Sequence, residues 1–439
     1  MSECADLRSI NALVEHCLPG EWGIDPVGGA SNCVVYRATD IDNEGHLRHD
    51  EGAERVVLLN KVTAKALKAN DIIVEASGGA PDKPVGRVAL FAGSSRKPAL
   101  VSNFFRAMRP RAGVDAKFLT FQLVALNRSS AIWRYQQQTT GLINLKVTDY
   151  LKHRVWMPAL SVQQKIAAIL TSLDTAIEKT EALIEKHQQI KAGLMHDLFT
   201  RGVLPNGQLR PLREQAPELY EETSHGWMPR GWEATTLRAC LAEGATNGIY
   251  KPAHLIGSGV LLIGQTALTP DRSVDPELAR RAIIEAAELQ RFGVYADDIL
   301  VSRVFATVEG VGQPALVPPL EEPAVFESNM MRFRVNAKLM RPRLLFEWLK
   351  TDRCRRHING RANASNQASI NQAVLYPMVV PVPPLDEQDR MLAAVGGCAA
   401  RIAEDLATLS KQRCLKTGLM QDLLTGKVPV KVAATGVPA

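Results

Sequence analysis

Residues Lys191 to Thr200 read KAGLMHDLFT, and residues Lys416 to Thr425 read KTGLMQDLLT. Seven of these ten positions are identical at an offset of 225 residues. Further matches keep the same order at offsets of 225 to 227, and they pair 71–74 with 298–301, 102–103 with 328–329, 143–144 with 370–371, and 158–163 with 383–388. A repeat of half the length of a 439-residue chain indicates a tandem duplication, because a solenoid needs a much shorter period.

Each copy combines a variable part with a long helix. The variable parts hold short strand-like runs between Gly and Pro residues, as at 85–92 and 259–263, and each ends in a helical run, 117–136 or 343–358. In the longer run that follows, apolar residues alternate steps of three and four, the spacing of a coiled-coil seam. The seam residues are Ile166, Ile169, Leu173, Leu183, Ile190 and Leu194 in the first copy and Leu392, Val395, Ile402, Leu406 and Leu409 in the second.

The ends of both long helices are marked in the sequence. Prolines 158, 383 and 384 precede the runs, and Gly202 and Gly426 stand where the helices should stop. A lone helix would expose its apolar stripe, so we expect the two to pack together, antiparallel if a pseudo-two-fold axis relates the halves. The alternative is that each helix packs only into its own domain.

The fold class that we expect is α+β: a tandem duplication of two α/β domains separated by two long helices packed as an antiparallel coiled coil. The expected boundaries are 1–156 and 211–380 for the two domains, and 157–210 and 381–439 for the helices with their linker and tail.

Composition limits the protein class. With 46% hydrophobic and 22% charged residues, the chain is not mainly disordered, and its longest charge-free stretch, 362–385, contains four prolines and cannot be a membrane helix. The N-terminal residues show no secretion signal, so we expect a cytoplasmic protein. The seven cysteines are widely spaced and form no CxxC, which predicts neither a disulfide framework nor a zinc site.

The net charge of +6 is distributed unevenly. Residues 83–134 hold ten basic residues against one acidic residue, and residues 330–361 hold ten against two, which leaves −11 for the rest of the chain. Both basic islands are richer in Arg than in Lys, and a guanidinium can hold phosphate or guanine with two parallel hydrogen bonds. The two islands therefore predict two contacts with a polyanion, the alternative for either one being a solvated surface.

Within the islands we expect most basic residues to hold phosphates and nearby amides to read bases, since an amide can bond adenine with two hydrogen bonds. Asn residues in such loops can also simply form turns. The basic candidates are Arg87, Arg96, Lys97, Arg106, Arg109, Arg111, Arg128, Arg134, Arg332, Arg334, Arg341, Arg343, Arg353, Arg355, Arg356 and Arg361, and the amide candidates are Gln136, Gln138, Asn366 and Gln367.

Catalytic motifs are not found. The sequence has no GxxxxGK[ST], HExxH or nucleophile elbow, and His187 on the seam has no second ligand at metal-site spacing. Asp82 and Asp115 with Lys117 faintly resemble the carboxylates and lysine of a metal-dependent nuclease, but Val308 stands where the second copy should repeat Asp82. The pattern favours a non-catalytic binding protein, with a nuclease and a free-standing DNA-binding regulator as alternatives.

The duplicated layout resembles the specificity (S) subunit of type I restriction-modification systems. The features that carry the resemblance are Pro-Pro-Leu-Asp-Glu-Gln at 383–388, the Leu-Met-x-Asp-Leu-[Phe/Leu]-Thr helix ends at 194–200 and 419–425, Pro-Gly-Glu-Trp at 19–22 and Pro-Arg-Gly-Trp-Glu at 229–233. The likeness covers nearly the whole chain. The first copy departs from it at 158–163, which lacks the second proline and the Glu.

The resemblance implies two target-recognition domains that each read one half of a split double-stranded DNA site. The paired helices would set the unread gap and carry two methyltransferase (M) subunits, with restriction (R) subunits completing the complex. S-adenosylmethionine, ATP and Mg²⁺ are then expected on the partners, and no cofactor, metal or membrane contact on this chain. As a helix, 162–199 would extend about 57 Å, more than one turn of DNA.

Overall fold

A computed structural model of the chain describes residues 7–26, 28–48, 52–80, 83–93, 95–139, 142–269, 272–364 and 367–431. Two positions singled out from the sequence, Asp82 and Asn366, lie outside these ranges. The chain divides into two compact units. Unit 1 consists of Met1–Glu181 and Ala407–Ala439, and unit 2 consists of Ala182–Leu406.

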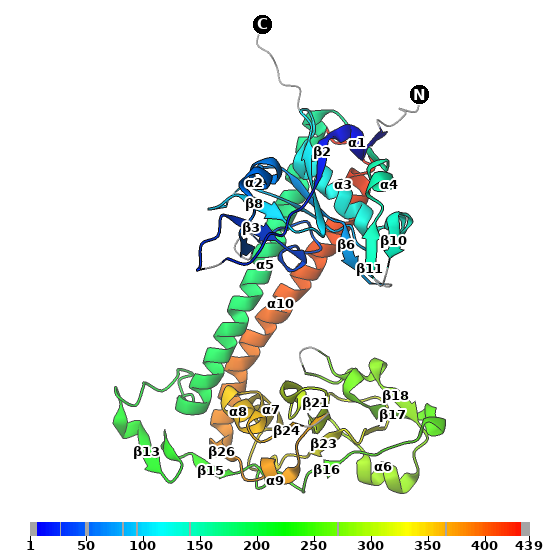
Figure 1. The fold of residues 1–439 in the computed structure, drawn as a ribbon. Coiled ribbons are helices and arrows are strands. Elements are labelled where there is room, and N and C mark those ends of the chain that lie inside the picture. Colours follow the sequence, from blue (N-terminus) through cyan, green and yellow to red (C-terminus); the bar gives the residue numbers. More distant parts are fainter. Residues whose placement is uncertain are drawn as a thin grey trace. The chain divides into compact units, whose positions relative to one another are not determined.

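Two long helices each belong to both units. Helix α5 (Leu160–Arg201) begins in unit 1 and ends in unit 2, whereas α10 (Leu385–Leu423) begins in unit 2 and ends in unit 1. Within each unit they lie side by side and antiparallel (Figure 1), joined by Asp174 and Lys416 in unit 1 and by His187 and Asp405 in unit 2. The expected packing of two long helices is confirmed, and α5 is about 63 Å long at 1.5 Å per residue.

Unit 1 is built on a four-stranded antiparallel sheet of order β2-β9-β5-β7, a three-stranded sheet of order β4-β3-β8 and smaller pairings. Strands β3 and β8 are parallel. The strands are β1 (Leu7–Ser9), β2 (Val14–Pro19), β3 (Cys33–Tyr36), β4 (Ala53–Arg55), β5 (Ile72–Glu75), β6 (Ser77–Gly79), β7 (Val88–Leu90), β8 (Ala99–Val101), β9 (Phe105–Pro110), β10 (Gln136–Thr139), β11 (Leu142–Leu145) and β12 (Arg154–Trp156). The helices are α1 (Ile10–Leu13), α2 (Leu59–Lys65), α3 (Ala116–Arg128) and α4 (Val147–Leu151).

Unit 2 repeats this topology. Its sheets β16-β23-β19-β21, β18-β17-β22, β24-β25-β20 and β15-β26 correspond in strand order to β2-β9-β5-β7, β4-β3-β8, β10-β11-β6 and β1-β12, and β17 and β22 are again parallel. The strands are β15 (Glu233–Thr236), β16 (Thr246–Asn247), β17 (Ile256–Ile263), β18 (Arg280–Ala282), β19 (Ile299–Ser302), β20 (Val304–Phe305), β21 (Pro314–Leu316), β22 (Ala324–Phe326), β23 (Met330–Phe333), β24 (Asn363–Ala364), β25 (Ala368–Ser369) and β26 (Val379–Val382), with a further hairpin of β13 (Tyr220–Thr223) and β14 (Gly226–Pro229). The helices are α6 (Ala286–Phe292), α7 (Pro342–Leu349), α8 (Asp352–Asn359) and α9 (Gln372–Leu375). The α+β tandem duplication expected from the sequence is confirmed.

The helical runs expected at 117–136 and 343–358 are both interrupted. Helix α3 gives way to a 3-10 segment, Ser130–Tyr135, because Ser129 is extended. Helices α7 and α8 are separate because Thr351 is extended and its hydroxyl accepts a hydrogen bond from the Cys354 N–H, which caps α8.

The repeated LMxDL stretch closes one hydrophobic core in each unit. Met195 and Leu198 of α5 are buried in the core of unit 2, beside Met391 and Val395 at the start of α10. Met420 and Leu423 of α10 are buried in the core of unit 1, beside Ile166 at the start of α5. Each helix therefore begins in one core and ends in the other.

Both helices bury the same positions. Ile166, Ile184 and Met195 on α5 are buried, and so are their counterparts Met391, Leu409 and Met420, each 225 residues on. The steps of 18 and 11 residues equal about five and three turns at 3.6 residues per turn. The buried residues thus recur with the 3.6-residue period of a straight helix. Residues spaced by alternating steps of three and four move around such a helix by about 20° per heptad.

Because of this drift, the expected seam residues differ in how deeply they are buried. Val395 joins Ile166 and Leu409 in being buried, whereas Ile169, Leu173, Leu194, Leu392 and Ile402 are half-buried. Leu183, Ile190 and Leu406 are 41%, 48% and 49% exposed. They therefore add little buried surface to the contact between the helices.

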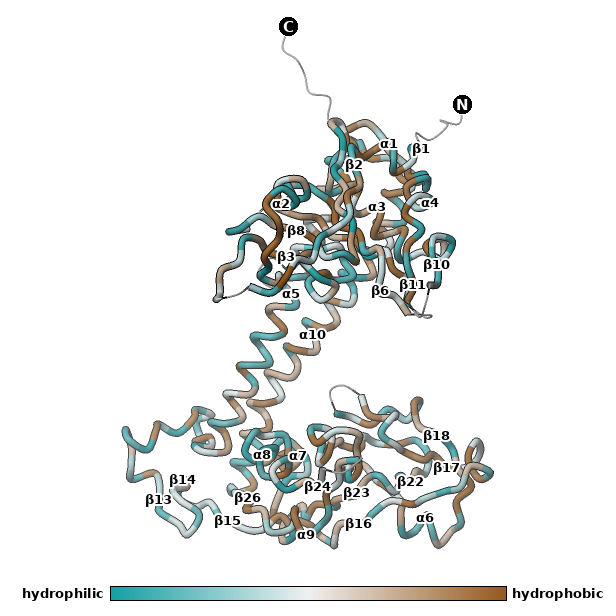
Figure 2. Tube along the Cα trace, in the orientation of Figure 1, coloured by the Kyte–Doolittle hydropathy of each residue, from teal (hydrophilic) through white to brown (hydrophobic). Residues whose placement is uncertain are grey.

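Polar residues occupy part of the contact between α5 and α10. His187 Nδ1 lies 2.7 Å from Asp405 Oδ2 in unit 2, and Lys416 Nζ lies 2.5 Å from Asp174 Oδ1 in unit 1. In Figure 2, hydrophobic residues gather in the strands and in α3, while hydrophilic and neutral residues dominate the middle of both long helices. Apolar burial in the helix pair is therefore greatest towards the helix ends, and Ile184 and Leu409 add buried apolar positions between them.

A buried glutamine fixes the start of each long helix. In unit 1, Gln163 Oε1 accepts from the Asp115 N–H at 2.9 Å and its Nε2 donates to the Pro158 carbonyl at 2.7 Å. In unit 2, Gln388 Oε1 accepts from the Arg341 N–H at 2.7 Å and its Nε2 donates to the Pro383 carbonyl at 2.8 Å. This is why the glutamine recurs in both copies.

The Glu that the first copy lacks ties α10 to the end of α5 in unit 2. Glu387 bonds both terminal nitrogens of Arg210, the indole N–H of Trp232 and the backbone N–H of Val203. Gly202, at φ +66°, ends α5 against this cluster, where a Cβ would collide with the Glu387 carboxylate and the Trp232 ring. In the first copy Val162 replaces Glu387 and packs against the core of unit 1.

We predict that Gln388→Leu lowers the free energy of unfolding by about 1–3 kcal/mol, since it leaves the backbone N–H of Arg341 and two carbonyls without their partner, the buried Gln388 amide. Urea unfolding followed by tryptophan fluorescence measures the change. Gln164→Leu, at an exposed position of α5, is the matched control and should stay within about 0.5 kcal/mol of wild type. Equal stabilities for the two variants would contradict the assignment.

Candidate nucleic-acid interface

One arginine of each basic island forms the same internal ion pair. Arg109 on β9 bonds both carboxylate oxygens of Asp71 at 2.8 and 2.7 Å, and Arg334 after β23 bonds both oxygens of Asp298 at 3.0 and 2.8 Å. Each aspartate immediately precedes the central strand beside its arginine, β5 or β19. The hydrogen bonds to Asp71 and Asp298 raise the pKa of Arg109 and Arg334. The recurrence of these arginines thus has a structural cause.

Further basic candidates also have partners within their own unit. Burial lowers the pKa of Arg332, which is only 4% exposed, and Arg106 is half-buried on β9. The partners are Glu75 for Arg87, Glu54 for Lys97, Glu44 for Arg128, Glu243 for Arg332, Asp389 for Arg341, and the carbonyl oxygens of Glu309 and Val311 for Arg355.

The partner acids explain why the local charge count is misleading. Asp71 and Asp298 lie 38 and 36 residues from their arginines, and Glu243 lies 89 residues from Arg332. All three carboxylates fall outside the sequence windows that define the islands. Much of the positive charge counted along the sequence is therefore neutralised in the fold.

The remaining basic candidates are exposed. Within the described ranges, we find no ion pair for Arg96, Arg111 and Arg134 of unit 1 or for Arg343, Arg353, Arg356 and Arg361 of unit 2. Arg353 and Arg356 project from α8 beside a hollow of about 490 Å³ that is also lined by Phe199 of α5 and by Trp348. The structure brings these two together but does not gather the exposed arginines of unit 1 at one element.

The amide candidates lie in equivalent hairpins of the two units. Gln136 and Gln138 are on β10, which pairs with β11, and Gln367 stands between β24 and β25. The Gln136 side chain is hydrogen-bonded within unit 1, to the backbone N–H and carbonyl of Val85. Gln138 and Gln367 are exposed. In the sequence these residues appear only as two separate amide-rich stretches. The structure shows that the two stretches belong to equivalent hairpins.

The catalytic alternative gains no geometric support. Asp115, one of the two proposed carboxylates, accepts a hydrogen bond from the Phe118 N–H at 2.8 Å and caps α3. In the described part of the chain no three His, Cys, Asp or Glu side chains are grouped as metal ligands, and six cysteines there are free thiols. No helix among the same residues is long and apolar enough to span a membrane.

Comparison with known proteins supplies the family. A family model described as the type I restriction modification DNA specificity domain matches residues 33–187. The type I restriction enzyme MjaVIII specificity subunit of Methanocaldococcus jannaschii is 21% identical over 349 residues, 76% of each chain. The StySPI specificity subunit of Salmonella potsdam is 22% identical over 346 residues, 76% of this chain and 68% of the relative.

Solved structures share the architecture over the full length. The S subunit of the type I restriction-modification system from M. genitalium matches with a TM-score of 0.52 and 14% identity, covering 98% of both chains. A chain from a structural study of assembly and conformational transition in the type I R-M system matches with a TM-score of 0.54 and 16% identity, covering 98% and 99%. The structural matches support the fold, and with the family model and the curated relatives they establish that this chain belongs to the specificity (S) subunits of type I restriction-modification systems.

Proposed function

We propose that this chain is the DNA-reading, non-catalytic subunit of a type I restriction-modification complex, recognising a target site in two parts. The observation that carries the proposal is the duplication: two units of matching topology present equivalent hairpins, β10–β11 and β24–β25. Two copies of one DNA-reading fold in a single chain suit a site whose halves differ in sequence. Family membership supports the absence of a catalytic role.

The two recognition domains are assigned to residues 1–156 and 211–380, and the helices with their linker and tail to 157–210 and 381–439. In this assignment Gln138, Asn366 and Gln367 read base edges, because amides can pair with adenine in the major groove. The exposed arginines, including Arg134, Arg353 and Arg356, hold phosphates and set the position of each domain on the duplex. The internally paired Arg109 and Arg334 instead stabilise the domains.

The partners are two methyltransferase subunits and the restriction subunits, assembled in the cytoplasm on double-stranded DNA. S-adenosylmethionine, ATP and Mg²⁺ belong to those partners, and this chain supplies only recognition and assembly. A free-standing DNA-binding regulator is the alternative, and it requires no methyltransferase subunit.

The decisive experiment is to co-express the chain with its methyltransferase subunit and map methylated adenines in a host without other adenine methylation. A split motif with a fixed gap of unread bases is the expected result. A stable complex is expected to co-purify, and the purified chain with Mg²⁺ alone should leave DNA uncut. A chain that binds DNA but never associates with the methyltransferase subunit would favour the regulator.

Arg353→Ala with Arg356→Ala should weaken DNA binding and reduce the slope of log K against log salt by about 0.9 for each lost phosphate contact. Arg355→Ala is the matched control on the same helix. Because Arg355 donates to the carbonyl oxygens of Glu309 and Val311 at 2.9 and 2.7 Å, its loss should lower the melting temperature and leave the salt slope unchanged. Titrations at several salt concentrations distinguish the two, and a wild-type slope in the double variant would argue against phosphate contacts.

Inserting seven residues after Glu181 and seven after Leu406 should lengthen the recognised gap by about three base pairs, since seven residues add about 10.5 Å of helix and one base pair rises about 3.4 Å. A heptad keeps the facing sides of the helices in place. Insertions of five residues turn those sides by about 140° and should abolish assembly. Methylome mapping of each variant measures the gap. An unchanged gap after the heptad insertion would contradict the proposal that the length of the paired helices sets the gap.

A further inference from the structure

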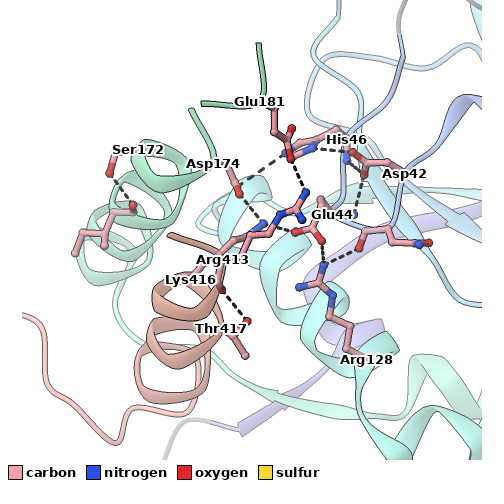
Figure 3. A network of polar contacts seen from close by, with 12 residues as sticks. Asp42, Glu44, His46, Arg128, Ser172, Asp174, Glu181, Arg413, Lys416 and Thr417 are labelled. Carbon is pink, nitrogen blue, oxygen red and sulfur yellow. Dashed lines mark hydrogen bonds and ion pairs between the residues drawn. The ribbon is translucent and has the colours of Figure 1, made fainter. Parts of the chain in front are cut away.

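A short loop of unit 1, residues 41–47, is held rigidly beside the long helices. An antiparallel bridge joins Ile41 and Leu47. Asp42 Oδ1 accepts the backbone N–H groups of Glu44 and His46 at 2.8 and 2.9 Å, and Asp42 Oδ2 lies 2.9 Å from His46 Nδ1. The loop therefore presents Glu44 and His46 towards α5 and α10 (Figure 3).

Lys416 of α10 joins this loop to α5. Its ammonium nitrogen lies 2.5 Å from Asp174 Oδ1 and 2.6 Å from Glu44 Oε2. Glu44 also pairs with Arg128 at the end of α3. One nitrogen atom thus connects both long helices with the loop of the recognition domain, and Figure 3 shows the side chains converging on it.

The ion pair at the centre of the cluster is buried, whereas the side chains of Glu44 and His46 are 45% and 41% exposed. Lys416 is 3% exposed and Asp174 is 6% exposed. His46 Nε2 lies 3.9 Å from the second oxygen of Asp174. The carboxylates of Asp174 and Asp42 raise the pKa of His46 to about 10, so the imidazolium remains charged at neutral pH.

These buried charges distinguish one register of the helices from its neighbours. Leu409 and Leu423 stand one heptad before and after Lys416 and are buried on the same side of α10. A slip of α10 by one heptad would bring a leucine opposite Asp174. The buried Lys416 would lose both of its carboxylate partners and Asp174 would keep only His46 at 3.9 Å, which is unfavourable. A purely apolar contact would penalise such a slip far less.

The duplication does not account for this pair. Ala399 stands 225 residues after Asp174, where a second copy of the aspartate would be. Lys191, the counterpart of Lys416, lies 3.5 Å from Glu347 of α7 in unit 2. The double contact of Lys416 with Asp174 and Glu44 is therefore found in one copy only.

We propose that Lys416 is a positioning residue that fixes the axial register of α10 on α5 through Asp174 and seats the first recognition domain on the helix pair through Glu44. The proposal rests on the function proposed above, in which the helix pair sets the unread gap. Because both helices continue from one unit into the other, a single defined register gives a single accepted gap length.

The test is the double variant Asp174→Leu/Lys416→Met in the complex reconstituted with its methyltransferase subunits. Replacing a buried ion pair by apolar residues of similar volume preserves folding, whereas removing one partner does not. DNA duplexes carry the two half-sites at the wild-type gap or at gaps about three base pairs shorter or longer, because a slip of one heptad displaces α10 by about 10.5 Å. Relative to the wild-type gap, methylation at the altered gaps should rise about tenfold, which corresponds to a loss of roughly 1.4 kcal/mol of discrimination.

The neighbouring pair Glu181 and Arg413 provides a matched control. Its side chains are 44% and 62% exposed, and such surface pairs contribute little. Glu181→Gln/Arg413→Gln should keep the wild-type gap preference. A folded Asp174→Leu/Lys416→Met complex with unchanged gap preference would overturn the proposal, as would failure of that variant to fold, since the pair would then serve stability. A wild-type complex that methylates no gapped site would instead disprove the proposed function.

Discussion

The structure depends on the burial of both ends of each long helix in two different hydrophobic cores. Ile166 at the start of α5 and Met420 at the end of α10 lie in the core of unit 1, while Met391 and Met195 take the corresponding places in unit 2. Neither core is complete without residues from both copies of the duplicated sequence. Hydrophobic burial therefore makes the two helices a shared element of both units.

The free energy of burial and the specificity of pairing come from different parts of the helix pair. Apolar contacts near the ends stabilise the association, but an apolar stripe tolerates a slip of one heptad. The polar contacts of Asp174 with Lys416 and of His187 with Asp405 lie between those ends. In the function proposed above, in which the helix pair sets the unread gap, a defined register matters as much as stability.

The arginines illustrate how fold and function compete for the same residue type. Arg109 and Arg334 recur in both copies because each holds an aspartate beside the central strand of its sheet. Recurrence within a duplication therefore marks structural residues as readily as functional ones. Arg353 and Arg356, exposed on α8, have no such internal carboxylate in the described structure and remain the better candidates for phosphate contacts.

The sequence by itself determined the duplication, the two long helices, their glycine stops and the family, because these features are written in neighbouring residues or in a repeat at constant offset. Only the tertiary structure decided which face of each helix is buried, since straight helices drift from a 3-4 stripe, and it left Leu183 and Ile190 exposed. Only the tertiary structure also decided which charges are free. Lys416 meets Glu44 across 372 residues, and no local pattern encodes a partner at that separation.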